Sequence, residues 1–311
     1  MSAAAPPLNV IVDTDVGTDD LMAISFLLSR SDVQIEAFTV ANGLAHVDAG
    51  AVNLLRLQAV IGANIPVYIG RSTPLQGDSH FPDAWRKKTD TLPGVNLPPA
   101  AGAPQAQSAV DFLTGRLASP ANPVTILAIG PLTNLGQVFQ QTPATVKAVR
   151  QMVIMGGAVG VPGNAPESSS HPVAEWNIYT DPYAAQLVFA SGVNPVLVPL
   201  NATNDVPIHE PFVKEFKARS RTPLGTIVGE ILDVDQVFIH QKTFFAWDPL
   251  AGVAVADPSV VSTTSMCIQV QQSGSAIGQT QQVTGQPANT QVSTSADAKN
   301  FKKTFLAAFE Q

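Results

Sequence analysis

Four aspartates stand within eight residues near the start of the chain: Asp13, Asp15, Asp19 and Asp20. The run before them, Leu8 to Val12, is apolar and predicts a short buried strand. The segment after them, Leu21 to Leu28, predicts an amphipathic helix. The acids therefore lie on a strand-to-helix turn. In an open α/β sheet this turn is at the carboxyl edge, where ligands bind.

The close spacing of these acids indicates a bound cation. Carboxylates gathered at one point repel one another when ionised, unless a cation neutralises them or some become protonated. Carboxylate and carbonyl oxygens suit Ca²⁺ or Mg²⁺, and the sequence offers no His or Cys cluster of the kind that zinc or copper needs.

The acidic turn could also belong to a helix cap, an EF-hand loop or a phosphatase active site. A helix cap would use one residue, Thr18 or Asp19, and would leave the remaining acids without a role. An EF-hand loop starting at Asp13 needs Gly at position six and Glu at position twelve, where this chain has Thr18 and Ile24. An aspartyl-phosphate phosphatase, whose strand ends in Asp-x-Asp with the first Asp as nucleophile, stays open.

Composition favours an α/β protein that acts on small molecules. The chain has 311 residues and 45% hydrophobic content, enough for one large domain or two small ones. Its net charge of −7 and its lack of a basic cluster argue against nucleic-acid binding. A single cysteine, Cys267, excludes an internal disulfide framework and a structural zinc site. No apolar run reaches the roughly 18 residues of a membrane span.

The cellular compartment stays open between the cytoplasm and the periplasm or exterior. The start Met-Ser-Ala-Ala-Ala-Pro-Pro is too short for a signal peptide, but it could be the stub left after one was removed. A charged fraction of 13% and a tail rich in Gln, Ser and Thr over 271–295 are weak indications of an extracytoplasmic protein.

Apolar runs alternate with helical patterns along the chain. This alternation predicts βαβ units with a mostly parallel sheet covered on both faces. The predicted strands are Ile35–Val40, Pro66–Ile69, Val124–Ile129, Val149–Met155 and Pro195–Val198. The predicted helices are Val47–Ile61, Leu132–Phe139, Asp181–Ala190, a helical stretch from Pro207 to about Lys242, and Ala296–Phe309. The stretches 71–107 and 156–173 are predicted to be long loops, which are usually functional.

Four further segments carry residues suited to a ligand site. They are Ile126–Asn134, Met155-Gly156-Gly157, Ala174–Pro182 and Ala246–Leu250. The first two follow predicted strands, and the glycines of the second allow the backbone to approach a ligand closely.

Together with the aspartate turn, these segments resemble the nucleoside hydrolase family, whose members split the N-glycosidic bond of ribonucleosides using Ca²⁺. The resemblance runs from about Leu8 to Val255 and is weaker towards the end of the chain. It implies a single domain over residues 1–311, with an open, mostly parallel but mixed sheet flanked by helices in a Rossmann-like arrangement. It also implies a homodimer or homotetramer.

The resemblance assigns roles residue by residue. It makes Asp15, Asp20 and Asp248 the side-chain ligands of Ca²⁺ and the Ile129 carbonyl the main-chain ligand, with Asp13 in or beside this shell. Asp19 matches the general base. The residues that match ribose contacts are Asn164, Glu175 and Asn177, with Met155 nearby and Asn42 where the family has a ribose-binding Asn or Asp. Val16 replaces the family's usual proline, which should alter the turn only slightly.

These roles make a consistent mechanism. A vicinal diol can replace two waters on Ca²⁺, so the ion would orient the ribose and hold the attacking water. Asp19 would take a proton from that water as it approaches C1′. Departure of the base ahead of attack gives the sugar oxocarbenium character, which carboxylates such as Glu175 stabilise. The anomeric centre should invert, because no enzyme nucleophile is needed.

The base-binding residues favour purines. Many broad-specificity members carry a His immediately before the last Ca²⁺-binding Asp, and this chain has Trp247 there. Trp85 lies in the long loop after the third strand. The pair resembles the purine-specific inosine-adenosine-guanosine branch, in which two tryptophans sandwich the base and ease its protonation. His80 could approach the base, and His240 lies where the family has a mobile lid.

Three further functions are compatible with the sequence. They are a broad-specificity inosine-uridine hydrolase, the phosphatase, and a non-catalytic nucleoside-binding protein. The phosphatase would need a lysine and a second acidic pair in later strands, and Gln137–Met155 supplies only Lys147. The binding protein is disfavoured because all the expected acids are present.

Overall fold

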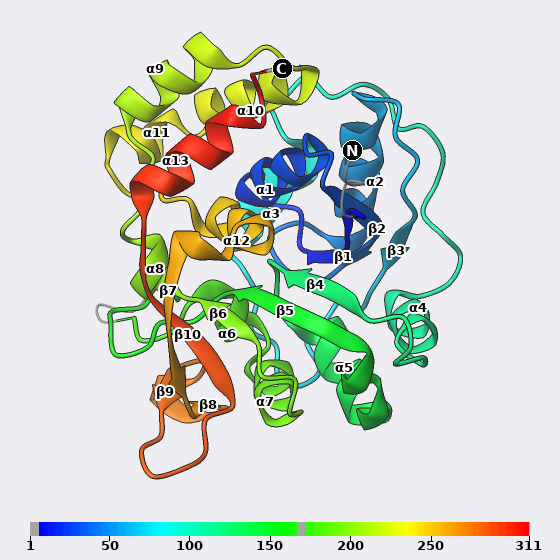
Figure 1. Ribbon diagram of the computed structural model, residues 1–311, viewed down its shortest axis with the longest axis vertical. Helices are drawn as coiled ribbons and strands as arrows, with labels where there is room; N and C mark the ends of the chain where they lie inside the picture. The colour runs from blue at the N-terminus through cyan, green and yellow to red at the C-terminus, as the bar shows by residue number, and fades with distance from the viewer. Residues whose placement is uncertain (1–5, 167–171, 311) are drawn as a thin grey trace, which may run out of the picture.

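A central eight-stranded sheet runs through the part of the protein that the computed structural model describes, residues 6–166 and 172–310 (Figure 1). Its strands are β1 Leu8–Thr14, β2 Val33–Val40, β3 Val67–Ile69, β4 Val124–Ala128, β5 Val149–Met155, β6 Val196–Val198, β7 Val261–Met266 and β10 Thr290–Ala296. The spatial order is β3-β2-β1-β4-β5-β6-β10-β7. Neighbours from β3 to β10 pair in parallel, whereas β7 runs antiparallel to β10. A separate hairpin pairs β8 Ile268–Val270 with β9 Thr280–Gln282.

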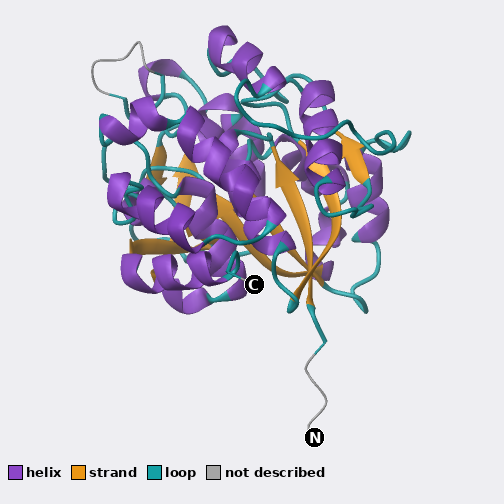
Figure 2. Ribbon diagram, turned by 90° about the horizontal axis from the view of Figure 1, so that it is seen from above, coloured by secondary structure: helices purple, strands orange, loops and turns teal. Residues whose placement is uncertain are grey.

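Helices cover both faces of this sheet (Figures 1 and 2). They are α1 Thr18–Leu28, α2 Val47–Ala59, α3 Asp83–Thr91, α4 Ala109–Arg116, α5 Thr133–Gln141, α6 Trp176–Thr180, α7 Pro182–Ala190, α8 Leu200–Thr203, α9 Glu210–Arg219, α10 Pro223–Val234, α11 Gln236–His240, α12 Trp247–Ala256 and α13 Ala298–Ala307. Because both faces are covered, the central strands are mostly apolar, and all five residues of β4 are buried.

The core has two large clusters, one on each face of the sheet, and a small third cluster formed by Phe81, Ala165 and Trp176. Residues of α1, α2, α10, α12 and α13 pack on one face, with a group of phenylalanines around Phe305. Residues of α4, α5 and α7 pack on the other face, around Phe189 and Leu197. The predicted α/β fold with a mixed, mostly parallel sheet is confirmed.

Most predicted elements form close to their expected bounds, with two corrections near the site. The first strand continues to Thr14, so Asp13 lies within the strand, while Asp19 and Asp20 lie in the first turn of α1. The stretch 71–107 is not one long loop, because it contains α3. The first five residues and 167–171 of the predicted loop 156–173 lie outside the described residues.

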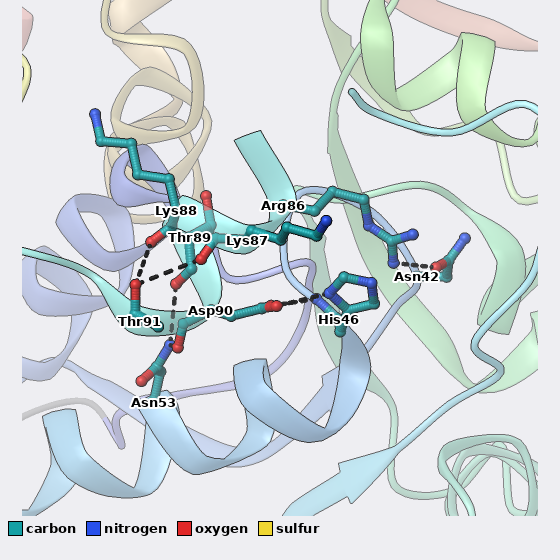
Figure 3. A network of polar contacts seen from close by, with 9 residues as sticks. All are labelled: Asn42, His46, Asn53, Arg86, Lys87, Lys88, Thr89, Asp90 and Thr91. Carbon is teal, nitrogen blue, oxygen red and sulfur yellow. Dashed lines mark hydrogen bonds and ion pairs between the residues drawn. The ribbon is translucent and has the colours of Figure 1, made fainter. Parts of the chain in front are cut away.

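A network of polar contacts fixes α3 against the end of β2 and against α2 (Figure 3). Asp90 accepts hydrogen bonds from the His46 backbone N–H at 2.9 Å and from its ring Nδ1 at 2.7 Å. The Asn53 amide donates to the backbone carbonyls of Thr89 at 3.3 Å and Asp90 at 3.2 Å. These contacts hold the helix that carries Trp85 and Lys88.

None of the described helices has both the length and the apolar character required to span a bilayer.

Candidate active site

A cavity of about 490 Å³ opens at the carboxyl ends of the central strands. Residues that follow β1, end β5 and follow β4 reach it, as expected for parallel strands whose ends meet at one edge. The sequence-predicted residues that line it are Asp15, Asp19, Asp20, Trp85, Ile129, Met155, Asn164, Glu175, Asn177, Trp247 and Asp248. Asp13 and Asn42 are not among the lining residues.

The acids meet at one end of this cavity. Carboxylate oxygens of Asp19, Asp20 and Asp248 all lie within 4.8 Å of one another. The Asp20 carboxyl group is also within hydrogen-bonding reach of both Asp15 and Asp248. Burial raises the pKa of Asp15, Asp20 and Asp248, and the charges of their acidic neighbours raise those of Asp15 and Asp248 further. Several ionised carboxylates cannot share this space without a counter-charge.

The turn between β1 and α1 holds Asp20 rigidly. The Thr14 hydroxyl donates to Asp20 Oδ1, and the Gly17 backbone N–H donates to Oδ2 at 2.8 Å. Asp20 thus binds back to Gly17, the residue that caps α1. Val16 has a φ of 61°, which the proline ring cannot adopt. A proline at position 16 could therefore not adopt this backbone conformation. The replacement of proline by Val16 thus changes the turn more than the sequence analysis expected.

Asp15 is enclosed by backbone from two other loops. The Leu44 N–H donates to Asp15 Oδ2 at 2.6 Å. A Cβ atom added to Gly43 would lie 2.0 Å from that same oxygen, and one added to Gly130 would lie 2.7 Å from the Asp15 nitrogen. Glycine is required at positions 43 and 130 because the backbone passes so close to Asp15 at both. The sequence prediction missed Gly43.

Asp13 lies behind the acid cluster. Its Oδ1 accepts hydrogen bonds from the Thr39 hydroxyl at 2.5 Å and the Asn134 amide at 2.8 Å. Its Oδ2 is buried and has no hydrogen-bond partner among the described residues. Burial raises the Asp13 pKa to about 7. A group beside the metal shell fits this position better than a ligand that faces the cavity.

Asn42 contacts α3 instead of the cavity (Figure 3). Its Oδ1 accepts a hydrogen bond from the Arg86 guanidinium at 2.9 Å, and both side chains are buried. Arg86 lies next to Trp85, so this contact helps to fix the wall that carries the tryptophan. The predicted ribose contact of Asn42 stays a prediction, because Asn42 is not among the residues that line the cavity.

Asn177 and Met155 surround the carbonyl that was predicted to bind the metal. The Asn177 amide donates to the Ile129 carbonyl at 3.1 Å and to the Met155 carbonyl at 3.3 Å. It also lies 3.6 Å from the Met155 sulfur. The Ile129 carbonyl keeps a second lone pair for a cation.

Glu175 has a structural role as well as a place in the cavity wall. Its Oε1 accepts from the Asn177 N–H at 2.9 Å, and its Oε2 accepts from the N–H groups of Gly157 at 2.9 Å and Ile178 at 3.2 Å. It thereby caps α6. Asn164 faces the same side of the cavity, and its Oδ1 accepts from the Trp176 N–H at 3.2 Å.

These donor atoms fit a hard divalent cation. The Asp20 carboxyl group lies within reach of those of Asp15 and Asp248, and Ile129 lines the same cavity. Among the described residues, Asp13 keeps an unpartnered buried oxygen behind them. An all-oxygen set of this kind suits Ca²⁺ or Mg²⁺ and does not suit zinc or copper.

Aromatic side chains form another part of the cavity wall, which is called the aromatic end below. Trp85 lies with its ring centroid 5.6 Å from that of Trp176, which stacks on Phe81 at 4.9 Å. Trp247 packs edge-on against Phe244 at 5.4 Å. The sequence prediction found Trp85 and Trp247 but missed Trp176, although it lies between two predicted residues, Glu175 and Asn177.

No histidine among the described residues lines this cavity. His80 is exposed, and its Nδ1 contacts the Phe81 carbonyl at 2.9 Å. His240 on α11 contacts Glu210 at 2.5 Å, and its side chain is 60% exposed. Neither imidazole is placed to protonate a bound base in this conformation.

Comparisons with known proteins agree with the fold. The closely matching solved structures include a plant nucleoside hydrolase, PpNRh1, with a TM-score of 0.88 and 29% identity over 98% of this chain and 99% of that one. A purine-preferring ribonucleoside hydrolase from Gardnerella vaginalis has a TM-score of 0.84 at 24% identity, over 97% of this chain and 98% of that one, which shows the shared fold.

Sequence relatives are named for pyrimidine specificity, whereas the sequence analysis favours purines. The pyrimidine-specific ribonucleoside hydrolase RihA of Citrobacter koseri is 35% identical over 82% of this chain and 78% of its own length. The family model for inosine-uridine preferring nucleoside hydrolases matches residues 10–303. The chain therefore belongs to the inosine-uridine preferring nucleoside hydrolase family, whose members hydrolyse the N-glycosidic bond of ribonucleosides.

Proposed function

We propose that this chain is a Ca²⁺-dependent ribonucleoside hydrolase that prefers purine nucleosides and releases the free base and ribose. One observation carries the proposal: a single cavity is lined both by carboxyl groups whose oxygens lie within 4.8 Å of one another and by tryptophans, Trp85 and Trp247 among them. A sugar with paired hydroxyls suits the carboxyl groups and an aromatic base suits the tryptophans. We further propose a single domain and a homodimer or homotetramer, which light scattering would test.

The acid cluster supplies the metal ligands in this proposal. Asp15, Asp20, Asp248 and the Ile129 carbonyl would hold Ca²⁺, with Asp13 behind them. When bound, the ion would polarise water and orient the ribose diol. Its charge would also favour the ionised form of the carboxyl groups around it.

Asp19 is the proposed general base. It lies in the first turn of α1, and burial together with Asp20 raises its pKa to about 8. It would accept a proton from the water that attacks C1′, while the base leaves and the ring oxygen gains positive charge. Glu175 would stabilise that charge, and Asn164 and Asn177 would bind the sugar hydroxyls.

Base preference rests on the aromatic walls. Stacking between Trp85 and Trp247 favours a large ring that gains positive charge as the bond breaks. Such stacking would ease protonation of the leaving base by solvent. No histidine of the described residues lines the cavity to supply that proton. The competing candidate is pyrimidine preference, because the RihA relatives are named for it.

One set of assays tests both levels of the proposal. Hydrolysis of inosine, adenosine, guanosine, uridine and cytidine is measured with added Ca²⁺ and with a chelator, and free base is quantified by chromatography. The proposal expects faster cleavage of the purines and loss of activity in the chelator that Ca²⁺ restores. Faster cleavage of uridine and cytidine would reject purine preference and leave the hydrolase assignment standing. Release of no base from any nucleoside would reject the hydrolase assignment.

A further inference from the structure

A buried carboxyl group, Asp235, lies in the cavity apart from the metal-binding acids. It follows α10 and precedes α11, it lines the cavity, and it is 4% exposed. Val234 and Phe238, which are close to it along the chain, also line the cavity, as does Trp247. Its negative charge also acts on Asp19. Asp235 therefore stands at the border between the acid cluster and the aromatic walls.

Asp235 does not cap the helix that it precedes. It stands immediately before the first turn of α11, where aspartates commonly act as caps. Its side chain makes no capping hydrogen bond. The Thr18 side chain lies within reach of the carboxyl group instead. Thr18 opens α1, so Asp235 is turned towards the helix that carries Asp19.

The hydrogen-bonding capacity of this carboxyl group is not met within the described residues. Its Oδ2 is buried and has no partner there. Burial raises the Asp235 pKa, and the Lys88 ammonium lowers it. Lys88 extends from α3 on the side away from Asn42 and His46 (Figure 3). Rotation about the Cβ–Cγ bond, a soft torsion in aspartate, can turn either oxygen to a donor in the cavity.

We infer that Asp235 recognises the base, by accepting a hydrogen bond from a ring N–H of an oxo-base such as hypoxanthine, guanine or uracil. This rests on the proposed function. If Asp19 lies beside C1′, a base attached to C1′ extends from Asp19 into the aromatic end, and Asp235 lies at that junction. A buried acceptor left without a donor is costly, so among the purines the site would favour hypoxanthine and guanine over adenine, which lacks the ring N–H.

The test compares inosine with purine riboside, which lacks both the ring N–H and the oxygen of hypoxanthine. In the wild-type enzyme kcat/KM should be higher for inosine. In Asp235→Ala the ratio of the two kcat/KM values should fall by about 10- to 100-fold, the loss of one hydrogen bond to a charged group. Asp235→Asn keeps an acceptor oxygen and should retain more of the ratio.

A matched control lies two residues upstream. Asp233 on α10 is 60% exposed and pairs with Lys217 outside the cavity, so Asp233→Ala should leave the ratio within about twofold of wild type. An unchanged ratio in Asp235→Ala would overturn the inference. So would equal losses on inosine, purine riboside and p-nitrophenyl riboside, which would show that Asp235 acts through Thr18 and Asp19.

A second measurement needs no variant. In 1-methylinosine a methyl group replaces the ring N–H, so the wild-type enzyme should cleave it at least about 10-fold less efficiently than inosine. Equal turnover of the two nucleosides would overturn the inference, even if Asp235→Ala does not fold. Either result leaves the proposed function standing, because that depends on wild-type cleavage of inosine itself.

Discussion

The side-chain amide of Asn177 donates a hydrogen bond to the backbone carbonyl of Ile129 at 3.1 Å. Asn177 is itself fixed, because its backbone N–H binds Glu175 at 2.9 Å. The carbonyl proposed as a metal ligand is therefore oriented by a side chain that is itself proposed to bind the ribose. Groups that orient metal ligands in this way strongly affect affinity.

Removal of this contact should weaken metal binding. Asn177→Ala is expected to lower Ca²⁺ affinity by about 10- to 100-fold, because the Ile129 carbonyl loses the donor that orients it. Isothermal titration of metal-free protein with Ca²⁺ measures this. Asn289→Ala is the control, since Asn289 also binds a backbone carbonyl, that of Ile268 at 2.9 Å, and does not line the cavity. Unchanged affinity in Asn177→Ala would remove this role.

Asp19 can be separated from the metal ligands by its effect on turnover. Asp19→Ala should reduce kcat for inosine by about 10²- to 10⁴-fold, because a general base acts mainly in the transition state. Its Ca²⁺ affinity should stay near that of the wild type. Asp248→Ala is the comparison, since loss of a ligand should impair both quantities. Loss of Ca²⁺ binding in Asp19→Ala would make Asp19 a ligand, which its position within 4.8 Å of Asp20 and Asp248 allows.

The sequence predicted the sheet and the acid cluster because both depend on local patterns. Apolar runs of strand length alternate with helical patterns, and the acids follow the first of them directly. Parallel strands then bring the residues after β1, β4 and β5 to one edge, whichever helices intervene. Asp15, Ile129 and Met155 meet for this reason.

Contacts made across the fold could not be predicted in this way. Arg86 donates a hydrogen bond to Asn42 only because α3 packs against the end of β2. The helix α3 itself lies in a stretch rich in Pro and Gly, which predicts a loop. Glycine is needed at position 43 only because a Cβ atom there would lie 2.0 Å from Asp15 Oδ2. Asp235 resembles a helix cap in sequence, and its place in the cavity depends on Thr18 of a distant helix.

The metal-free protein should lose stability as the pH rises. Burial raises the pKa of Asp13 from 3.8 to about 7 and that of Asp19 from 3.8 to about 8. At pH values between the unfolded and the folded pKa of each group, the folded protein binds more protons than the unfolded chain. The free energy of unfolding therefore falls with increasing pH. The Tm in a chelator should therefore fall from about pH 5 to about pH 8.

Excess Ca²⁺ should remove most of this fall, because a bound divalent cation favours the ionised carboxylates. Calorimetry at several pH values, with Ca²⁺ and with chelator, measures both effects. Asp19→Asn removes one of the titrating groups and should show a smaller fall in the chelator. A Tm that rises over the same range without metal would contradict the proposed burial of these acids.

Trp247 should contribute more to the cleavage of inosine than to that of p-nitrophenyl riboside. Its half-buried ring packs against Phe244 at the aromatic end of the cavity, and it precedes the proposed metal ligand Asp248 in the chain. Stacking on an aromatic side chain is worth about 1–3 kcal/mol per base, so Trp247→Ala should lower kcat/KM for inosine by about 10- to 100-fold. Trp247→Phe keeps an aromatic face and should lose less. The p-nitrophenyl leaving group needs no protonation, so its cleavage should fall much less in Trp247→Ala. Equal losses on the two substrates would mean that Trp247 supports the position of Asp248 and does not activate the base.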